Sequence, residues 1–436
     1  MTIAAVLVLF QHAYDPQAPV HGAPWLWFTI IKILVVFTVL MVTIAYLTLA
    51  ERKISAWIQD RHGPNRVGPR GLFQPLADGL KNIMKEETYP SAAYGPLFIL
   101  APVMSFIPAL ITFAVIPFAA PLPTPWGLVD MSIADLPVGF LYILAIASLG
   151  VYGIVLAGWS SNNKYALLGG LRSSAQMVSY EVSMGLAAVS VLLLSGNVSL
   201  SSIVTSQIQT GWFAFPLLIG FFLFLVAAFA ETNRLPFDLP EAESELIAGY
   251  HTEYSSMKFS MFFIAEYSNM VTASALLTTL FFGGWAVPFW TSVDVAPWHW
   301  WKTLITLVFF MLKTGFFLFL YMWIRWTLPR FRYDQLMSVG WKVMLPIALG
   351  YLVIMAAAVL GLEMAGIAPT ARLGGFVPIY WAILAALNIV LAVLVFVVLD
   401  RGRLVSPAYA RVGAVELAEL RAMAIRRPPL TPTQGD

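Results

Sequence analysis

Long uninterrupted apolar runs dominate the chain, and polar loops separate them. A helix needs about 20 residues to cross the hydrocarbon layer of a bilayer. Nine runs reach or approach that length, and they cover residues 26–50, 96–118, 138–159, 176–195, 213–230, 258–283, 302–325, 341–363 and 376–399. The runs do not alternate apolar and polar residues, as the strands of a membrane barrel do. The pattern therefore predicts an all-α membrane protein with about nine transmembrane helices.

The composition leads to the same class. Hydrophobic residues make up 59% of the chain, charged residues only 11%, and the mean hydropathy is +0.79. Soluble domains carry roughly 25% charged residues, so this chain has too little polar surface to cover itself in water. The apolar stretch at residues 1–10 is short and has no basic residues before it, so we expect no cleaved signal peptide.

Lys and Arg are concentrated in alternate loops. Eighteen of the 25 lie in residues 51–94, 160–175, 231–256, 326–340 and 401–436, whereas the opposite set of loops holds only Arg372. Basic loops stay on the cytoplasmic side, so we expect the N-terminus outside and the C-terminus inside. The predicted organisation is an outer segment (1–25), an eight-helix membrane core (26–363), an additional transmembrane helix (364–400) and a basic cytoplasmic tail (401–436).

The first inner loop has shape as well as charge. Residues 51–60 have the pattern of an amphipathic helix in the membrane interface, with Ile54, Trp57 and Ile58 on one face. The glycines and prolines of GPNRVGPRG then impose an irregular but fixed path. The arginines here could be a simple lipid anchor, or a rigid surface that docks a partner or a polar headgroup. An anchor needs charge but no shape, so the turn residues favour the second interpretation.

Carboxylates crowd the loop after the fifth run. Residues 231–256 contain one arginine, Arg234, and six acids, which are Glu231, Asp238, Glu241, Glu243, Glu245 and Glu253. A short helix is predicted around residues 240–249. The loop could be a solvated acidic face, but Leu235 and Phe237 indicate that part of it packs down. Partly buried carboxylates have raised pKa values and exchange protons near neutral pH.

A few ionisable residues lie inside the apolar runs, namely Lys32, Glu181, Glu266 and Lys313. A charge at the bilayer centre costs about 2.5–3.5 kcal/mol, so such residues usually face a wet, protein-lined path. Lys32 is near enough to the outer face to snorkel. The others either hold helices together as paired groups or serve ion movement. Glu266 and Lys313 have similar depths, which suggests that they pair.

The sequence excludes several kinds of cofactor chemistry in this chain. It has no cysteine, so it forms neither disulfides nor thiolate-held iron–sulfur clusters. Its five histidines all lie in loops, and it has no Gly-rich phosphate-binding motif. Buried acids without cofactor ligands are typical of a channel, a transporter or the proton-handling part of a larger assembly.

Four segments together closely resemble the H-subunit family of respiratory complex I. They are AERKISAWIQDRHGPNRVGPRGLFQPLADGLK, KYALLGGLRSSAQMVSYEVSMGL, AETNRLPFDLPEAESELIAGYHTEYSSMKFSMFFIAEYSN and LYMWIRWTLPRFRYDQLM. The last segment alone could be a stop-transfer flank, but the four occur in order between about residues 26 and 363. The resemblance implies a multi-pass subunit of a proton-pumping NADH:quinone oxidoreductase, in a bacterial inner (plasma) membrane rather than a mitochondrial one.

The resemblance also implies partners and residue roles. The chain would work with the other membrane and peripheral subunits, with quinone and with lipids, but not with nucleic acid. It would hold no redox centre or metal, because FMN and the iron–sulfur clusters belong to partner subunits. The residues expected near the quinone tunnel are Arg52, Arg61, Asp78, Arg234, Arg325, Arg330 and Arg332. The residues expected on the proton path are Glu181, Glu231, Asp238, Glu241, Glu243, Glu245, Glu253, Glu266 and Lys313.

Three other functions share some of these features. The equivalent subunit of a membrane-bound hydrogenase or related dehydrogenase shares the fold, but the GPNRVGP and PRFRYDQLM segments favour the NADH:quinone branch. The absence of inverted repeats argues against a stand-alone proton channel or transporter, and the acids inside the runs argue against a mere scaffold. The ninth run and the tail have no counterpart in shorter family members, and we assign no role to them or to His251.

Overall fold

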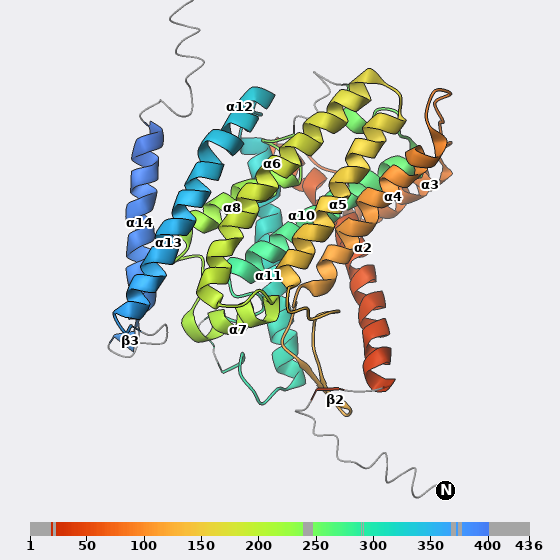
Figure 1. The fold of residues 1–436 in the computed structure, drawn as a ribbon. Coiled ribbons are helices and arrows are strands. Elements are labelled where there is room, and N and C mark those ends of the chain that lie inside the picture. The colour runs from red at the N-terminus through yellow and green to blue at the C-terminus, as the bar shows by residue number, and fades with distance from the viewer. Residues whose placement is uncertain are drawn as a thin grey trace, which may run out of the picture.

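The computed structural model describes residues 19–20, 23–238, 247–288, 290, 292–367, 372–373 and 377–400. The described chain is an almost entirely helical bundle (Figure 1). The long helices are α2 (Ala23–Ile58), α4 (Gly95–Ile111), α5 (Gly139–Ser160), α6 (Lys164–Ser195), α10 (Ser256–Phe281), α11 (Trp300–Thr327), α13 (Leu345–Met364) and α14 (Ile379–Asp400). The shorter α-helices are α3 (Gln74–Met84), α7 (Leu200–Thr210), α8 (Leu218–Glu231) and α12 (Tyr333–Val339).

Short irregular elements complete the fold. Single turns of 3₁₀-helix are η1 (Pro69–Gly71), η2 (Thr112–Val115) and η3 (Gly249–His251), and η4 (Gly340–Met344) is a π-helical turn between α12 and α13. Two small antiparallel hairpins pair β1 (Leu122–Thr124) with β2 (Gly127–Val129), and β3 (Arg372–Leu373) with β4 (Val377–Pro378).

The predicted all-α membrane class is confirmed. Each of the nine apolar runs coincides with a helix, and among the described residues seven helices are long and apolar enough to cross a membrane. Helix α8 is shorter than these, and α10 carries many Ser and Thr residues. Every residue of α10 from Met270 to Phe281 is buried. This part of the central helix therefore contacts other parts of the protein rather than lipid. The number of spans and their orientation stay predictions.

Small residues let the helices of the bundle approach closely. Gly153 of α5 faces α4 so tightly that a Cβ there would lie 2.7 Å from the backbone nitrogen of Ser105. At Gly158, also in α5, a Cβ would lie 2.6 Å from the carbonyl oxygen of Ala166 in α6. Association of helices in lipid depends on such close packing because apolar burial gives no driving force there. The close packing of α5 against α4 and α6 therefore requires glycine at these two positions.

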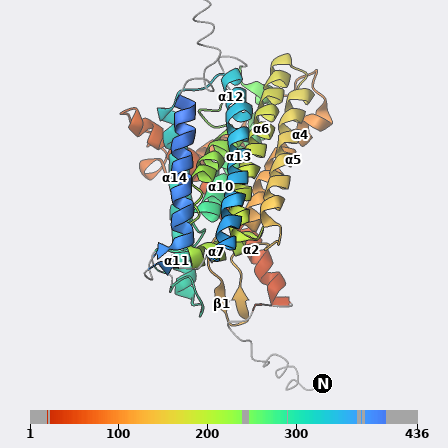
Figure 2. The ribbon, with the colours of Figure 1, turned by 60° about the vertical axis from the view of Figure 1, so that its left-hand side comes forward.

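The two predicted sets of loops lie at opposite ends of the bundle. Helices α3 and α12 mark one end, and α7 with the β1–β2 hairpin marks the other (Figures 1 and 2). We call the end that holds the basic loops the inner end. At the outer end, Lys32 Nζ donates hydrogen bonds to the carbonyl oxygens of Asp130 (3.0 Å) and Ser132 (2.7 Å). Lys32 thus reaches the outer loops, as its predicted snorkelling requires.

The prediction of a separate interfacial helix at residues 51–60 is wrong. Helix α2 continues without a break to Ile58, because no Gly or Pro interrupts it. Glu51 and Ser55 in these last turns are buried. The amphipathic helix of this loop is α3 instead, whose Leu76 and Ile83 are more than 60% exposed.

Helix α14, formed by the ninth run, joins the bundle through a buried amide. Asn388 is fully buried and donates from Nδ2 to the carbonyl oxygen of Pro216 (2.6 Å) at the start of α8. Its Oδ1 accepts a hydrogen bond from the hydroxyl of Tyr351 in α13 (2.9 Å). In lipid a polar side chain must find such partners within the protein. Figure 1 shows α14 at the left-hand edge of the bundle.

The orientation can be tested with single cysteines, because the chain has none of its own. Asn65 and Gln209 are both exposed, the first in the inner loop before α3 and the second in α7 at the outer end. We expect a membrane-impermeant maleimide to label Gln209→Cys in sealed right-side-out vesicles, and to label Asn65→Cys only after detergent opens them. The reverse pattern would contradict the positive-inside assignment.

Candidate functional site

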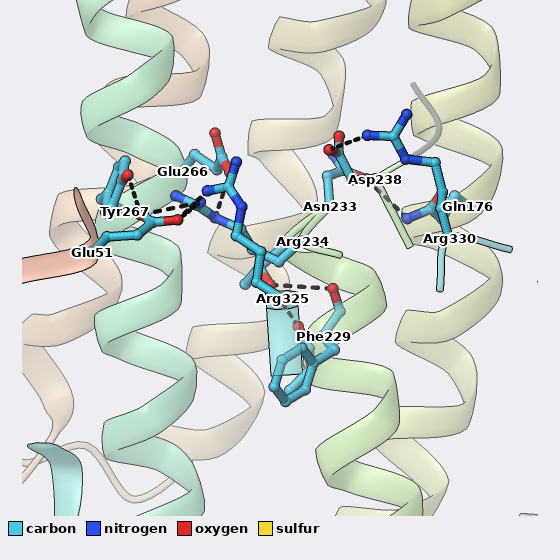
Figure 3. Close-up of polar contacts among 12 residues, drawn as sticks. Glu51, Gln176, Phe229, Asn233, Arg234, Asp238, Glu266, Tyr267, Arg325 and Arg330 are labelled. Carbon is cyan, nitrogen blue, oxygen red and sulfur yellow. Dashed lines mark hydrogen bonds and ion pairs between the residues drawn. The ribbon is translucent and has the colours of Figure 1, made fainter. Parts of the chain in front are cut away.

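A group of charged side chains is buried near the inner end of the bundle. Arg234 lies at its centre, with Nη1 3.1 Å from Glu51 Oε1 and Nε 2.7 Å from Glu266 Oε1. Arg325 and the hydroxyl of Tyr267 also bond to the Glu51 carboxylate. We call these five residues the inner charge cluster (Figure 3).

Four separate segments build the cluster. Glu51 comes from the last turns of α2, Glu266 and Tyr267 from α10, and Arg325 from the last turn of α11. Arg234 comes from the turn that follows α8. There Asn233 adopts a left-handed conformation (φ 50°), which asparagine tolerates better than most residues. This turn directs Arg234 back towards α2 and α10.

The cluster is balanced in charge and shielded from solvent. Two carboxylates face two guanidinium groups, and the side chains of Glu51, Arg234 and Glu266 are 7%, 10% and 13% exposed. A buried charge without a partner costs several kcal/mol, so each of these groups depends on the others. Burial disfavours the charged form of Arg234, but Glu266 and Glu51 outweigh it and raise the pKa of Arg234 well above its usual value.

A second ion pair lies in the same region, with greater access to solvent. Asp238 Oδ2 is 3.3 Å from Arg330 Nη2, and their side chains are 17% and 38% exposed. Burial raises the pKa of Asp238 and outweighs the opposite effect of Arg330 and Arg325. Asp238 therefore holds a proton more readily than an exposed aspartate does.

A third ion pair belongs to the first inner loop. Arg52 Nη1 lies 2.7 Å from Asp78 Oδ2, which joins the end of α2 to α3, and Arg52 is 53% exposed. Arg52 directly follows Glu51 in the chain, so this pair is next in sequence to the inner charge cluster. These two pairs and the cluster together place charged groups from the exposed inner surface to the buried interior.

Two further acids lie in the helices behind the cluster. Glu181 of α6 accepts a hydrogen bond from the hydroxyl of Ser148 in α5. Glu231, the last residue of α8, lines a cavity of about 30 Å³ together with Asn269 and Thr272. A cavity needs roughly 10–15 Å³ to hold one water molecule. This cavity therefore has room for a water, and its walls offer polar partners for one.

The structure brings some predicted residues together and leaves others apart. Arg234, Glu266 and Arg325 meet in the cluster, whereas Arg61 donates to Gln59 (2.7 Å) at the exposed surface. Arg332 is also exposed. Glu253 accepts a hydrogen bond from Asn163 Nδ2 (2.7 Å) at the start of α6. The residues Glu241, Glu243 and Glu245, with most of the predicted helix at 240–249, lie outside the described residues.

The expected pairing of Glu266 with Lys313 is wrong. Glu266 pairs with Arg234, and Lys313 Nζ donates to the carbonyl oxygens of Phe282, Gly284 and Ala286 at 2.6–3.0 Å. These carbonyls lie where α10 ends at the outer side, so the two charges face opposite ends of the bundle. Similar position along two spans did not imply proximity, and a role of Lys313 in proton movement stays a prediction.

Sequence reasoning missed two members of the cluster, Glu51 and Tyr267. Glu51 directly follows the first apolar run, and its assignment to an interfacial helix concealed its burial. One signal was available: an acid, rather than a basic residue, comes first at the inner end of this span. Tyr267 gave no signal of its own beyond being next to Glu266.

The chain is similar to known proteins over most of its length. The sequence model of the family described as NADH dehydrogenase matches residues 31–356. The chain is 53% identical over 326 residues to the H subunit of NADH-quinone oxidoreductase from Leptospira biflexa, which covers 72% of this chain and 90% of that protein. It is 51% identical over 341 residues to the H subunit numbered 1 of the same enzyme from Geobacter sulfurreducens, with 75% and 94% covered. Helix α14 lies beyond the range that the family model matches.

Neutralising Arg234 should be costly because it leaves the buried Glu266 without its ion-pair partner and leaves Glu51 with Arg325 alone. We expect Arg234→Gln to destabilise the purified protein by about 3–5 kcal/mol, and the added change Glu266→Gln to restore part of this. The midpoint of thermal unfolding in one detergent measures both effects.

The control is Arg52→Gln, since an exposed pair is worth about 0–1 kcal/mol. Equal midpoints for Arg234→Gln and Arg52→Gln would contradict the buried network.

Proposed function

Because this chain belongs to the H-subunit family of NADH-quinone oxidoreductase, as a multi-pass membrane subunit of respiratory complex I, we propose that its inner charge cluster couples quinone reduction to proton translocation. Membership of the family makes the other subunits of complex I its partners. We propose that quinone enters from the lipid past the inner end of α2 and α3. FMN and the iron–sulfur clusters are expected in partner subunits, and the assembly is expected in a bacterial inner membrane.

The observation that carries this proposal is the balanced, buried cluster itself. Arg325 is its most exposed member at 35%, so it can offer a guanidinium to a polar headgroup arriving from the inner surface. The oxygens of a quinone accept hydrogen bonds, and they become strongly basic as electrons arrive. Reduction of a quinone to a quinol takes up two electrons and two protons. The electrons come from partner subunits, while side chains of this chain hold and deliver charge.

The balance of the cluster makes it sensitive to such a change. A negative charge near Arg325 competes with Glu51 for the guanidinium. Glu51 then loses part of its stabilisation as an anion, and its affinity for a proton rises. Glu266 shares Arg234 with Glu51, so the redistribution extends to Glu266. This coupling needs no movement of a helix, because buried charges interact strongly at short range.

The acids behind the cluster provide a route for protons into the membrane. In the proposal, protons pass from Glu266 to Glu231, which lines the small cavity with room for a water molecule, and on to Glu181. Asp238 and the remaining acids of the loop, Glu241, Glu243, Glu245 and Glu253, supply protons from the inner side. Asp78, Arg52, Arg61, Arg330 and Arg332 shape the approach of the quinone, and Lys313 is proposed as the cation at the far end.

Removing the charge of Arg325 tests the quinone part of the proposal. We expect Arg325→Gln to lower NADH:quinone turnover about 10- to 100-fold, the effect of losing one or two charge-assisted hydrogen bonds. NADH oxidation with ferricyanide as acceptor should stay normal in the same membranes, because electrons still enter through partner subunits.

Lys342→Gln is the matched control, since Lys342 is an exposed cation of η4 and has no place in the proposed quinone approach. Arg325→Gln with normal quinone turnover would remove the cluster from the quinone path.

Removing the charge of Glu266 tests the proton part. We expect Glu266→Gln to lower the number of protons pumped per NADH by at least about half, because one carrier of the proposed route is lost. Pumping is measured in vesicles against quinone turnover in the same preparation.

Glu363→Gln, an exposed acid of α13, should pump normally. An unchanged ratio in Glu266→Gln would exclude Glu266 from the route, and Glu241→Gln offers an independent trial of the acidic loop.

A further inference from the structure

Three fully or nearly fully buried side-chain amides hold turns of this bundle in place. They are Gln176 of α6, Gln207 of α7 and Asn388 of α14, with exposures of 0%, 2% and 0%. Each binds backbone groups at the end of a neighbouring helix. In a protein surrounded by lipid, a buried amide is expected to satisfy both its donor and its acceptor.

Gln207 and Asn388 meet that expectation. Gln207 donates from Nε2 to Thr279 O (2.8 Å), and its Oε1 accepts from the backbone N–H of Gly283 (2.8 Å). Asn388 donates to Pro216 O and accepts from Tyr351. Both amides lie towards the outer end of the bundle, where they bind the ends of neighbouring helices.

Gln176 differs from the other two. Its Nε2 lies within hydrogen-bond distance of three acceptors, the carbonyls of Ala230 (2.9 Å) and Phe237 (2.8 Å) and Asn233 Oδ1 (3.1 Å). An amide nitrogen has only two protons to donate. Its buried Oε1 has no hydrogen-bond partner among the residues that the structure describes. The two N–H groups of Nε2 are therefore shared among three acceptors, while Oε1 accepts no hydrogen bond from the described residues.

The position of these acceptors gives Gln176 a particular task. Ala230 and Phe237 are the two ends of the turn that carries Arg234, so one side chain closes this turn like a clasp. Asn233, next to Arg234, is held by the same α6 through a hydrogen bond from Nδ2 to Ser173 Oγ (2.9 Å). The turn is thus tied to α6 at three points, and none of these ties involves Arg234 itself.

We propose that Gln176 is a positioning residue for the quinone-coupled reaction, which holds Arg234 in reach of Glu51 and Glu266 and releases the Phe237 end of the turn during turnover. The effect of Gln176 on quinone turnover rests on the proposed function, but the hydrogen bonds that close the turn do not. Release at Phe237 frees the chain leading to Asp238, since Asp238 is the next residue. Bonds to Ala230 and Asn233 remain, so Arg234 keeps its partners. On release, the unpaired Oε1 of Gln176 can accept a hydrogen bond from a new donor. Its Nε2 keeps Ala230 and Asn233 as acceptors.

Hydrogen–deuterium exchange of the assembled complex tests the clasp directly. In Gln176→Leu the backbone N–H groups of Asn233, Arg234 and Phe237 should exchange at least about tenfold faster than in the native protein, because the turn opens locally. The matched control is Gln207→Leu, which removes an equally buried amide at the other end. It should speed exchange near Gly283 and leave the Arg234 turn unchanged.

Enzyme kinetics then test the positioning role. We expect kcat for quinone to fall at least about tenfold in Gln176→Leu, with ferricyanide reduction normal, and kcat in Gln207→Leu to stay within about twofold of native. Gln176→Glu adds a readout that a purely structural role would not give. A protonated carboxyl can donate to one carbonyl and a carboxylate cannot, so its turnover relative to native should rise as the pH falls from 8 to 6.

The outcomes separate the two proposals. Unchanged exchange at 233–237 in Gln176→Leu overturns the clasp, whatever the quinone kinetics are. Faster exchange with native kcat, equal loss of kcat in Gln207→Leu, or a flat pH ratio in Gln176→Glu overturns the positioning role. If Gln176→Leu does not assemble, Gln176→Glu carries both measurements. Failure of the proposed function would appear instead as normal quinone turnover in Arg325→Gln.

Discussion

The ion pairs of Arg234 with Glu51 and Glu266 are the interaction on which the inner half of this protein depends. One guanidinium joins α2 to α10 through two carboxylates, and it does so with side chains that are at most 13% exposed. A charge in such surroundings is stable only with well-placed partners. The turn after α8, the ends of α2 and α11, and the buried face of α10 must therefore be held in a fixed relation for the cluster to exist.

Much of the remaining polar structure serves that relation. Gln176 and Asn233 tie the turn of Arg234 to α6, and Tyr180, one helical turn after Gln176, donates to the carbonyl of Leu336 in α12. Phe237 packs between the rings of Tyr180 and Phe331. The loop that bears the charges is thus surrounded by aromatic and amide contacts. At the outer end, Lys313 and Gln207 hold the chain after α10 in a similar way, with no link to the cluster in the contacts described.

In the proposed function, the same arrangement lets a protein with few charges respond to redox chemistry in partner subunits. Some of its charged residues form pairs, from the exposed Arg52 and the half-buried Asp78 to the buried Glu266. Interactions between buried charges are screened far less than those in water. In the proposed function, a change of charge at the accessible Arg325 therefore alters proton affinity at the far side of the cluster without large motion of the bundle.

The sequence by itself determined the class of the protein, the places of its helices and the family. Apolar runs of about 20 residues allow only helices in lipid, since every backbone group must be satisfied within the segment. The sequence also indicated that Glu266 and Glu181 are functional candidates, because charges are rare in such runs. Arg234 lies in a loop and became a candidate through the family resemblance. The tertiary structure decided which charges meet. Glu51 lies more than 180 residues from Arg234 along the chain, and depth along a span says nothing about the direction in which a side chain faces. Only the packing of α2, α8, α10 and α11 selects Arg234 over Lys313 as the partner of Glu266.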